Sequence, residues 1–251
     1  MMELYLSGSI TNDEWEQFKE QGCLFLLQTY YEMQSWKEEK IKRALNCCKT
    51  FMLDSGAFTF MNSGKKVNWK QYVDGYCNFI NKYNIELFIE LDLYGVLGIE
   101  TTEKIRRYIE HHTGKKPIPV YHGTLPISYF RQLCQQYPYV AISATGTIES
   151  SKWTKNKKAL KQLIKIGHGY GTKLHGLGYT RIDNINRPEI LFDSVDSTSW
   201  LSGARFGTLY YMKHGILRQK NCAGLGFSRK QFNDNNLKIW IDKQKQLYYD
   251  E

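Results

Sequence analysis

The sequence lacks several features that would place it in common functional classes. None of its six cysteines belongs to a CxxC pair or to a Cys/His cluster with zinc spacing, which excludes zinc ribbons and fingers and indicates reduced cysteines that pack in the core. No run of about 18 apolar residues occurs, and the first residues lack the basic flank and apolar stretch of a signal peptide. These absences predict a cytoplasmic protein with no membrane partner.

Composition indicates a folded, basic protein. The chain has 251 residues, 42% of them hydrophobic, which is enough for a sizeable core. This length allows one large domain, such as a single barrel, or two small ones. The formal net charge is +9, and 14% of the residues are aromatic. A surplus of positive charge predicts a polyanionic partner, and nucleic acid is the partner we expect.

Short apolar runs alternate with longer segments of helical periodicity. Each run ends near a polar residue or a glycine, which is typical of strands in parallel βαβ units. Their number favours an α/β fold of the (β/α)₈ TIM-barrel type over an open sheet, which usually has fewer strands. The eight runs are ELYLSGS (3–9), CLFLLQT (23–29), TFMLDSG (50–56), LFIELDL (87–93), IPVYHGT (118–124), YVAISATG (139–146), KLHGLGY (173–179) and LFDSVDS (191–197).

The pattern predicts one barrel domain over residues 1–217 and a short C-terminal helical extension over 218–251. An amphipathic helix is expected near 229–248. The first helix is expected to begin at Thr11, because Glu14 follows at the spacing of a capping box. The other expected helices span 33–47, 68–83, 101–113, 127–137 and 154–167.

Polar residues close the apolar runs where a barrel would carry its active site. In such barrels the chemistry lies at the carboxyl ends of the strands. Burying several acids together costs free energy unless they are paired, hydrated or reactive, so the set is a candidate functional cluster. Its members are Gln28, Asp54, Asp92, His122, Ser143, His175, Asp193 and Asp196.

Structural roles are the alternative for each member of this set. Asp54 and Asp92 could cap the helices that follow them, and either histidine could bond a loop backbone. Asp193 and Asp196 are three residues apart, so on one strand they would face opposite sides, and only one of them is expected in the cleft.

An ordered series of motifs over residues 50–205 resembles the tRNA-guanine transglycosylase superfamily. LDSGAF (53–58) resembles its DSGG-type motif, and VDSTSW (195–200) resembles the FDSASY-type motif that holds the catalytic aspartate in the archaeal branch. Between them, ELDLYG resembles the segment with the base-recognising aspartate. PVYHG, YVAISATG and KLHGLGYT resemble the VQG, AIGG and LMGVGTP segments.

The resemblance implies a (β/α)₈ glycosyltransferase that exchanges guanine in nucleic acid for a free 7-deazaguanine base such as preQ0, with no cofactor and no metal. Asp196 would be the nucleophile that forms a covalent glycosyl-enzyme, and Asp193 would replace it if the bacterial-type FDCV spacing is the better guide. Asp54 would be the general base or a hydrogen-bond acceptor. The base-binding residues would be Asp92, His122, Ser143, Ala144, His175 and Gly176.

A base that leaves its stack needs a pocket with flat walls. Tyr94, Tyr121 and Tyr179 follow the ends of apolar runs, so they could stack on the base. Ordinary packing is the alternative for all three.

The chain also departs from the tRNA enzymes. Their CxCxxC…H zinc site after the barrel is missing, since Cys222 is the only late cysteine, and His122 stands where they have glutamine. A compact zinc-free chain is similar to the transglycosylases, many of them phage-encoded, that insert 7-deazaguanines into DNA. DNA is therefore the preferred partner and tRNA the alternative, while the oligomeric state stays open.

Lysines offer a surface for the nucleic-acid backbone. The stretch at 151–173 contains seven of them, and Lys152, Lys155, Lys157 and Lys158 at its start are the expected contacts. Phosphate neutralisation by these residues predicts salt-dependent binding. A solvated helix face is the structural alternative.

Two further function classes stay open. Asp92, His122, His175 and Asp196 could form the metal site of a TIM-barrel hydrolase, although the first run lacks an HxH pair. A catalytically inactive nucleic-acid-binding barrel would show the same salt dependence but would form no covalent complex.

Overall fold

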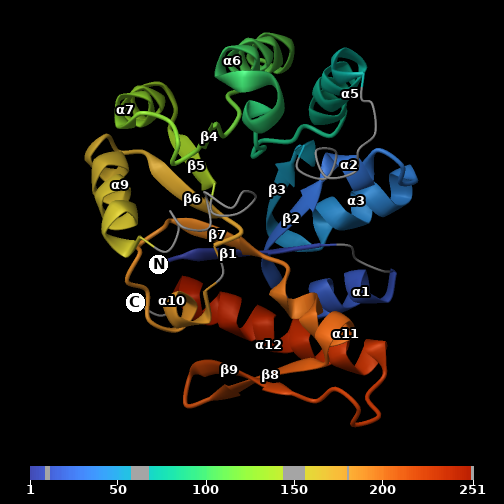
Figure 1. Cartoon of the computed structure of the whole chain (residues 1–251). Helices are drawn as coiled ribbons and strands as arrows, with labels where there is room; N and C mark the ends of the chain where they lie inside the picture. The colour runs from blue at the N-terminus through green and yellow to red at the C-terminus, as the bar shows by residue number, and fades with distance from the viewer. Residues whose placement is uncertain (9–11, 58–67, 144–155, 180, 250–251) are drawn as a thin grey trace. The chain divides into compact units, whose positions relative to one another are not determined.

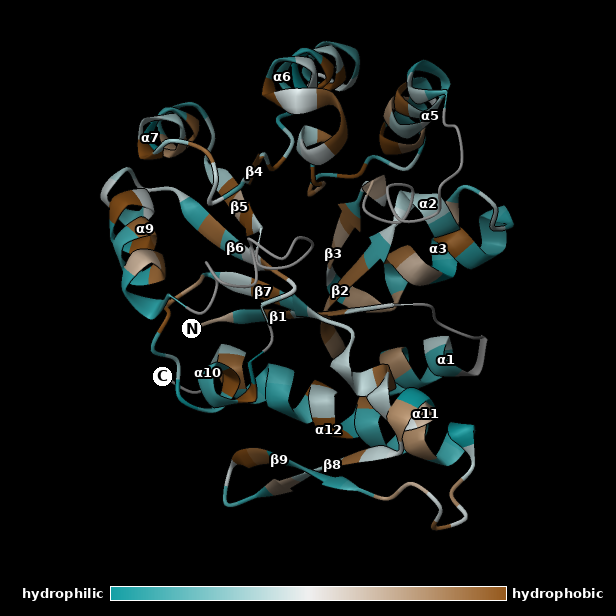
Figure 2. Ribbon diagram, in the orientation of Figure 1, coloured by the Kyte–Doolittle hydropathy of each residue, from teal (hydrophilic) through white to brown (hydrophobic). Residues whose placement is uncertain are grey.

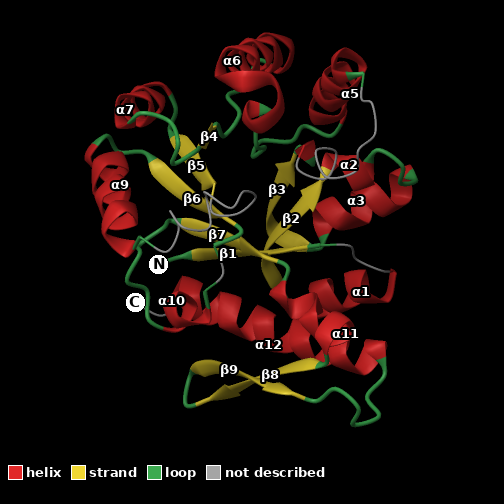
Figure 3. Ribbon diagram, in the orientation of Figure 1, coloured by secondary structure: helices red, strands yellow, loops and turns green. Residues whose placement is uncertain are grey.

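The computed structural model describes residues 1–8, 12–57, 68–143, 156–179 and 181–249, and it has the expected alternation of strands and helices (Figures 1 and 3). Seven parallel strands form one sheet in the order β3-β2-β1-β7-β6-β5-β4. The strands are β1 (Glu3–Ser7), β2 (Cys23–Thr29), β3 (Cys48–Asp54), β4 (Val120–Tyr121), β5 (Tyr139–Ser143), β6 (Lys173–Leu177) and β7 (Ser194–Ser197).

The remaining apolar run, at 87–93, contributes two isolated parallel bridges. Phe88 pairs with Leu53 of β3, and Ile89 pairs with Ile118, two residues before β4. Because β3 and β4 are the two edge strands of the seven-stranded sheet, these bridges join its edges. The hydrogen-bonded ring therefore closes, and the predicted (β/α)₈ TIM barrel is confirmed.

Helices follow the strands at most of the expected positions. The α-helix α6 begins seven residues earlier than expected and contains a break at Gly98, where φ is 75°. The expected first-helix cap at Thr11 lies outside the described residues. The helices up to β7 are α1 (Asn12–Glu20), α2 (Tyr30–Met33), α3 (Glu38–Asn46), α5 (Trp69–Lys82), α6 (Tyr94–Thr113), α7 (Ile127–Gln136), α9 (Lys157–Gly169) and α10 (Ile182–Asn186).

After β7 the chain forms two short helical turns, a hairpin and a long helix. These elements are η1 (Ser199–Leu201), α11 (Ser202–Phe206), β8 (Thr208–Lys213), β9 (Ile216–Asn221) and α12 (Arg229–Tyr249). The expected terminal helix is thus present as α12, while the hairpin was not expected. The expected boundary between residues 217 and 218 falls inside β9. Of the described helices, none combines the length and apolar character needed to cross a membrane.

The chain divides into two compact units. Unit 1 comprises Met1–Leu27, Glu38–Phe51 and Gly176–Glu251, and unit 2 comprises Gln28–Lys37 and Met52–His175. Each unit has its own buried core, and apolar residues are concentrated on the strands while the helices mix apolar and polar residues (Figure 2). This distribution is expected where helices cover parallel strands on the outside.

Unit 1 is centred on β1, whose Leu4, Tyr5 and Leu6 are completely buried. The strand pairs in parallel with β2 and with β7, where Tyr5 lies opposite Asp196. A continuous apolar run of this kind can be buried on both faces, so it favours a central parallel strand.

The long helix α12 is part of the core of unit 1. Gln244 is fully buried, and its amide donates to the carbonyls of Leu4 and Phe25 at 2.7 Å each and accepts from the amide of Leu24 at 2.6 Å. One side chain of α12 thereby satisfies backbone groups of both β1 and β2. Leaving these groups unpaired would cost about 1–3 kcal/mol each, so the helix stabilises the first two strands.

Candidate active site

Three of the predicted acids lie at the carboxyl-terminal parts of barrel strands. Asp54 is the last residue of β3, Asp196 is the third of four residues in β7, and Asp92 follows the bridge at Ile89. Each is half-buried. Since (β/α)₈ enzymes carry their chemistry at this end of the strands, all three remain candidates.

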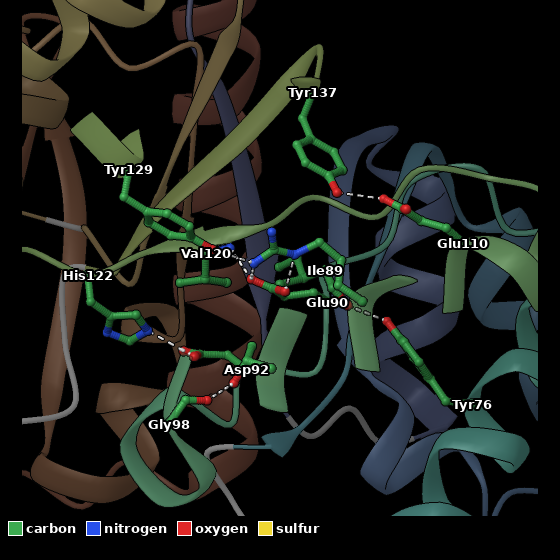
Figure 4. A network of polar contacts seen from close by, with 12 residues as sticks. Tyr76, Ile89, Glu90, Asp92, Gly98, Glu110, Val120, His122, Tyr129 and Tyr137 are labelled. Carbon is green, nitrogen blue, oxygen red and sulfur yellow. Dashed lines mark hydrogen bonds and ion pairs between the residues drawn. The ribbon is translucent and has the colours of Figure 1, made fainter. Parts of the chain in front are cut away.

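Asp92 and His122 form a partly exposed pair in unit 2 (Figure 4). His122 Nε2 lies 2.8 Å from Asp92 Oδ1, and 18% and 24% of the two side chains are exposed. The ring of Tyr94 lies 4.8 Å from the imidazole, centroid to centroid. The group combines a carboxylate acceptor, an imidazole and an aromatic face, which suits a planar heterocycle that carries N–H donors.

Asp92 does not cap the helix that follows it. The residue before α6 is Leu93, and no side chain makes a capping hydrogen bond there. The N-cap role considered for Asp92 is therefore wrong, while its other structural alternative, a turn residue, stays open; its described polar contact is with His122.

A buried ion pair lies next to the Asp92–His122 pair (Figure 4). Glu90 Oε2 is 2.6 Å from Arg106 Nε, and Glu90 Oε1 accepts from the amide of Val120 at 2.5 Å. Glu90 lies two residues before Asp92, and Val120 lies two residues before His122. We call Glu90, Arg106 and the Val120 amide the Glu90 clamp, because it fixes the two segments that end in Asp92 and His122.

The Glu90 clamp lies in surroundings that shift its pKa values. Burial raises the pKa of Glu90 to about 7, and the nearby Asp92 charge adds to this, while Arg106 and the Val120 amide oppose it. The pKa of Arg106 is raised, because attraction to Glu90 outweighs its burial. Arg106 also donates to the Tyr129 hydroxyl at 3.2 Å. The sequence interpretation missed this clamp, although an acid inside an apolar run signals a buried partner.

Two buried tyrosines of α5 donate hydrogen bonds to the backbone carbonyls on either side of Asp54. Tyr72 donates to the carbonyl of Ser55 at 2.6 Å, and Tyr76 donates to the carbonyl of Ile89 at 2.7 Å and to that of Leu53 at 3.5 Å. Burial raises the pKa of both phenols, and the Asp54 charge contributes. The two tyrosines thus remain protonated donors that fix the backbone on either side of Asp54.

Asp196 is held by the backbone of the turn after β6 in unit 1. Its Oδ1 accepts from the amide of Gly178 at 2.6 Å, and Gly178 has a φ of 62°. A few residues on, Trp200 is completely buried and donates to the carbonyl of Ser7 at 2.8 Å. The motif VDSTSW therefore combines a half-buried carboxylate that a backbone amide holds with a tryptophan that is fixed in the core.

Asp193 lies just outside the amino end of β7. It precedes the first residue of β7, and its carbonyl accepts from the amide of Glu3, the first residue of β1. The expectation that both acids share one strand is wrong, because the strand begins after Asp193. A position at the amino end is unsuitable for a nucleophile in this fold, so Asp196 is the better candidate.

The other predicted base-binding residues are mostly buried. Ser143 ends β5 and is 6% exposed, and His175 lies within β6 with no exposed surface. A Cβ at Gly176 would lie 2.9 Å from Tyr179 Cβ and 3.0 Å from the Phe192 ring, so packing alone requires glycine there. Ala144 lies outside the described residues.

Of the three candidate stacking residues, one is accessible. Tyr121 and Tyr179 are each 3% exposed and pack against Phe130 and Phe192, which supports the packing alternative for both. Tyr94 is half-exposed and lies against His122. Among these tyrosines, Tyr94 is the one placed to contact a ligand.

The predicted lysine contacts are only partly described. Lys157 and Lys158 are exposed in the first turn of α9, while Lys152 and Lys155 lie outside the described residues. Within the described ranges, no three His, Cys, Asp or Glu side chains lie close enough together to hold a metal ion. The four residues considered for a metal site therefore form no such group here.

Comparison with known proteins supports the fold. No protein-family model and no curated protein sequence matches the chain. Tryptophan synthase subunit alpha from Campylobacter jejuni is similar with a TM-score of 0.52 and 11% identity, over 94% of this chain and 95% of that one. A protein of Aquifex aeolicus VF5 is similar with a TM-score of 0.57 and 10% identity, over 98% and 92%. At these identities the likeness establishes a TIM-barrel fold alone.

Proposed function

We propose that the protein is an enzyme that exchanges guanine in DNA for a 7-deazaguanine through a covalent intermediate on Asp196. The observation that carries the proposal is the position of this carboxylate near the carboxyl end of β7, with Oδ1 fixed by the Gly178 amide at 2.6 Å. A nucleophile held in one orientation loses little freedom on reaction, which lowers the barrier. The ordered motif resemblance supplies the reaction type.

The proposed reaction has two displacement steps. In the first, an Asp196 oxygen bonds to the sugar C1′ as the C1′–N9 bond breaks, and guanine leaves with the bonding electrons and takes up a proton from solvent. In the second, N9 of the incoming base bonds to C1′ and the bond to Asp196 breaks. Asp54 accepts the N9 proton and releases it to solvent. A carboxylate suits this role because it stabilises an oxocarbenium-like centre and can trap it.

Recognition of the base is assigned to Asp92, His122 and Tyr94. Asp92 accepts from the N–H groups of the purine edge, His122 keeps this carboxylate in position, and Tyr94 stacks on the ring. The 2.8 Å contact between the first two residues and the partial exposure of all three support this assignment. Base stacking on an aromatic ring contributes about 1–3 kcal/mol per base, so Tyr94 is a substantial part of the proposed affinity.

The experiment is exchange of radiolabelled guanine into duplex DNA and, in parallel, into unmodified tRNA. Wild type is compared with Asp196→Ala and with Asp193→Ala as the matched control three residues away. We expect label in DNA, loss of label with Asp196→Ala, and retention with Asp193→Ala. Label in tRNA alone would replace DNA by tRNA as the substrate, and label in neither would refute base exchange.

A further inference from the structure

The segment after β7 has an unusual charge composition. From Ser197 to Asn233 the sequence contains no aspartate or glutamate, although the chain has 25 of them. The same segment contains six cations, Arg205, Lys213, Arg218, Lys220, Arg229 and Lys230. Acid-free basic segments of this kind are the electrostatic footprint of a polyanion-binding surface.

The β8–β9 hairpin lies at the centre of this segment and has two different faces. Its antiparallel register pairs Tyr210 with Gln219 and Met212 with Leu217 on one face. Tyr210 and Leu217 are buried, and the Tyr210 ring makes an edge contact with Trp240 of α12 at 5.2 Å. This face is therefore fixed to α12, next to which the hairpin lies in Figure 1.

The opposite face of the hairpin carries the cations. The register pairs Tyr211 with Arg218, Leu209 with Lys220, and Lys213 with Ile216, so these six side chains share one face. We call it the cationic hairpin face. Its three cations are exposed and Tyr211 is half-exposed. In the part of the chain that the structure describes, no carboxylate pairs with Lys213, Arg218 or Lys220.

The hairpin is a rigid support for these charges. His214 and Gly215 form its two-residue turn with φ values of 53° and 73°, which is the geometry of a type I′ turn. Asn236 of α12 accepts from the amide of Tyr210 at 2.9 Å and so anchors the inner strand. Because the backbone is fixed from one side, binding would have to order the cationic side chains but not the hairpin backbone, which keeps this part of the entropic cost small.

We propose that the cationic hairpin face binds duplex DNA. The two-stranded ribbon presents cations on one face and packs against α12 with the other. This arrangement allows the cationic face to contact the major groove of a duplex. That groove of B-form DNA is about 12 Å wide and admits such a ribbon, whereas the corresponding groove of A-form RNA is deep and narrow. The choice of DNA as the partner rests on the proposed function.

The test compares two doubly substituted full-length proteins. Arg218→Ala/Lys220→Ala removes two charges from the cationic hairpin face, and Lys104→Ala/Arg107→Ala removes two from the exposed side of α6. Binding of a fluorescent 20-base-pair DNA, and of duplex RNA with the same sequence, is followed by anisotropy over a series of salt concentrations. Thermal unfolding checks that each variant is folded.

We expect the hairpin variant to bind DNA about tenfold or more weakly than wild type. The slope of log Kd against log salt should also be smaller by about 2, because each removed cation would neutralise one phosphate. The α6 variant should bind like wild type, and RNA binding should be equal for all three proteins. Equal losses in both variants, an equal loss on RNA, or no DNA binding by wild type would each overturn the proposal. A protein partner for this face would appear as unchanged DNA binding in the hairpin variant.

The same proteins separate this proposal from the proposed function. If the hairpin variant loses DNA binding while wild type exchanges no guanine, the docking surface stands and base exchange is refuted. If wild type exchanges guanine and the hairpin variant binds DNA as tightly, the docking surface is refuted and base exchange stands.

Discussion

The two carboxylates of the proposed reaction are held in different ways. Asp92 contacts a side chain, His122, and the segments that carry both are joined by the Glu90 clamp. Asp196 contacts the backbone amide of Gly178, in a turn whose φ of 62° favours glycine. The first arrangement therefore depends on a network of side chains, whereas the second depends on the conformation of one turn.

The difference fits the proposed roles. A carboxylate held by a side chain can adjust its orientation as a ligand arrives, which suits recognition. A carboxylate held by a backbone donor is fixed before the ligand binds, which suits a nucleophile. Substitutions should therefore separate the two carboxylates. Changes of side chains should weaken the role of Asp92 in recognition, and changes of the backbone should weaken the role of Asp196 as nucleophile.

The largest expected effect is that of Asp196→Asn. The amide keeps the shape of the side chain but is a very poor nucleophile, so exchange of labelled guanine should fall about ten-thousandfold. The melting temperature should stay close to that of wild type. If exchange stayed within tenfold of wild type, Asp196 would not be the nucleophile, and the contact of its carboxylate with the Gly178 amide would have no role in the reaction.

Arg106→Met should have the next largest effect, on stability. It leaves the buried Glu90 without its counter-charge, so the free energy of unfolding at pH 8, measured in urea, should fall by about 3–5 kcal/mol. Arg107→Met, one residue further along α6 and exposed, is the control and should change stability by no more than about 0.5 kcal/mol. Equal effects of the two substitutions would show that the Glu90 clamp does not stabilise the fold.

The pKa of Glu90 predicts a smaller, pH-dependent effect. Burial raises this pKa from 4.5 to about 7, so the folded protein holds the proton more tightly than the unfolded chain does. The stabilisation is complete below pH 4.5 and is lost as the pH rises to 7, a change of about 3 kcal/mol. Glu90→Gln should abolish this part of the pH dependence in urea unfolding, and an unchanged profile would contradict the shifted pKa.

Gly178→Ala should have the smallest effect. An alanine at a φ of 62° costs about 1–2 kcal/mol, and relaxation of the turn would move the amide that holds Asp196. We expect exchange to fall about tenfold with no change in the binding of free base, measured by calorimetry. Gly95→Ala is the control, since a Cβ there meets nothing within 4 Å. A loss of base binding instead would assign the turn to recognition.

Most of the barrel could be predicted because its strands are buried on both faces and so are continuous in apolar character. The run 87–93 is the exception, since Glu90 in its centre bonds the Val120 amide through its side chain, and only two bridges form beside it. The β8–β9 hairpin was missed because its turn is His-Gly, without the Asn or Asp that marks a type I′ turn.

The candidate site was predictable where a polar residue closes an apolar run, as Asp54, Asp92 and His122 do. The Glu90 clamp was not, because the partner of Glu90 lies 16 residues away on α6, and helical periodicity does not identify which helix face meets a given strand. The apolar run places Asp193 inside the strand, whereas β7 begins one residue later at Ser194, and Asp193 contributes only its carbonyl to the hydrogen bonds with β1.

The contact of Gln244 with Leu4, Leu24 and Phe25 also bears on the order in which the chain folds during synthesis. The backbone groups of β1 and β2 that Gln244 satisfies are made first, and Gln244 leaves the ribosome more than 200 residues later. Unit 2 ends at His175, so all of its residues are available well before α12 is made. We therefore expect the contacts within unit 2 to form before β1 and β2 gain their contacts with α12, the reverse of the usual N-terminal-first order.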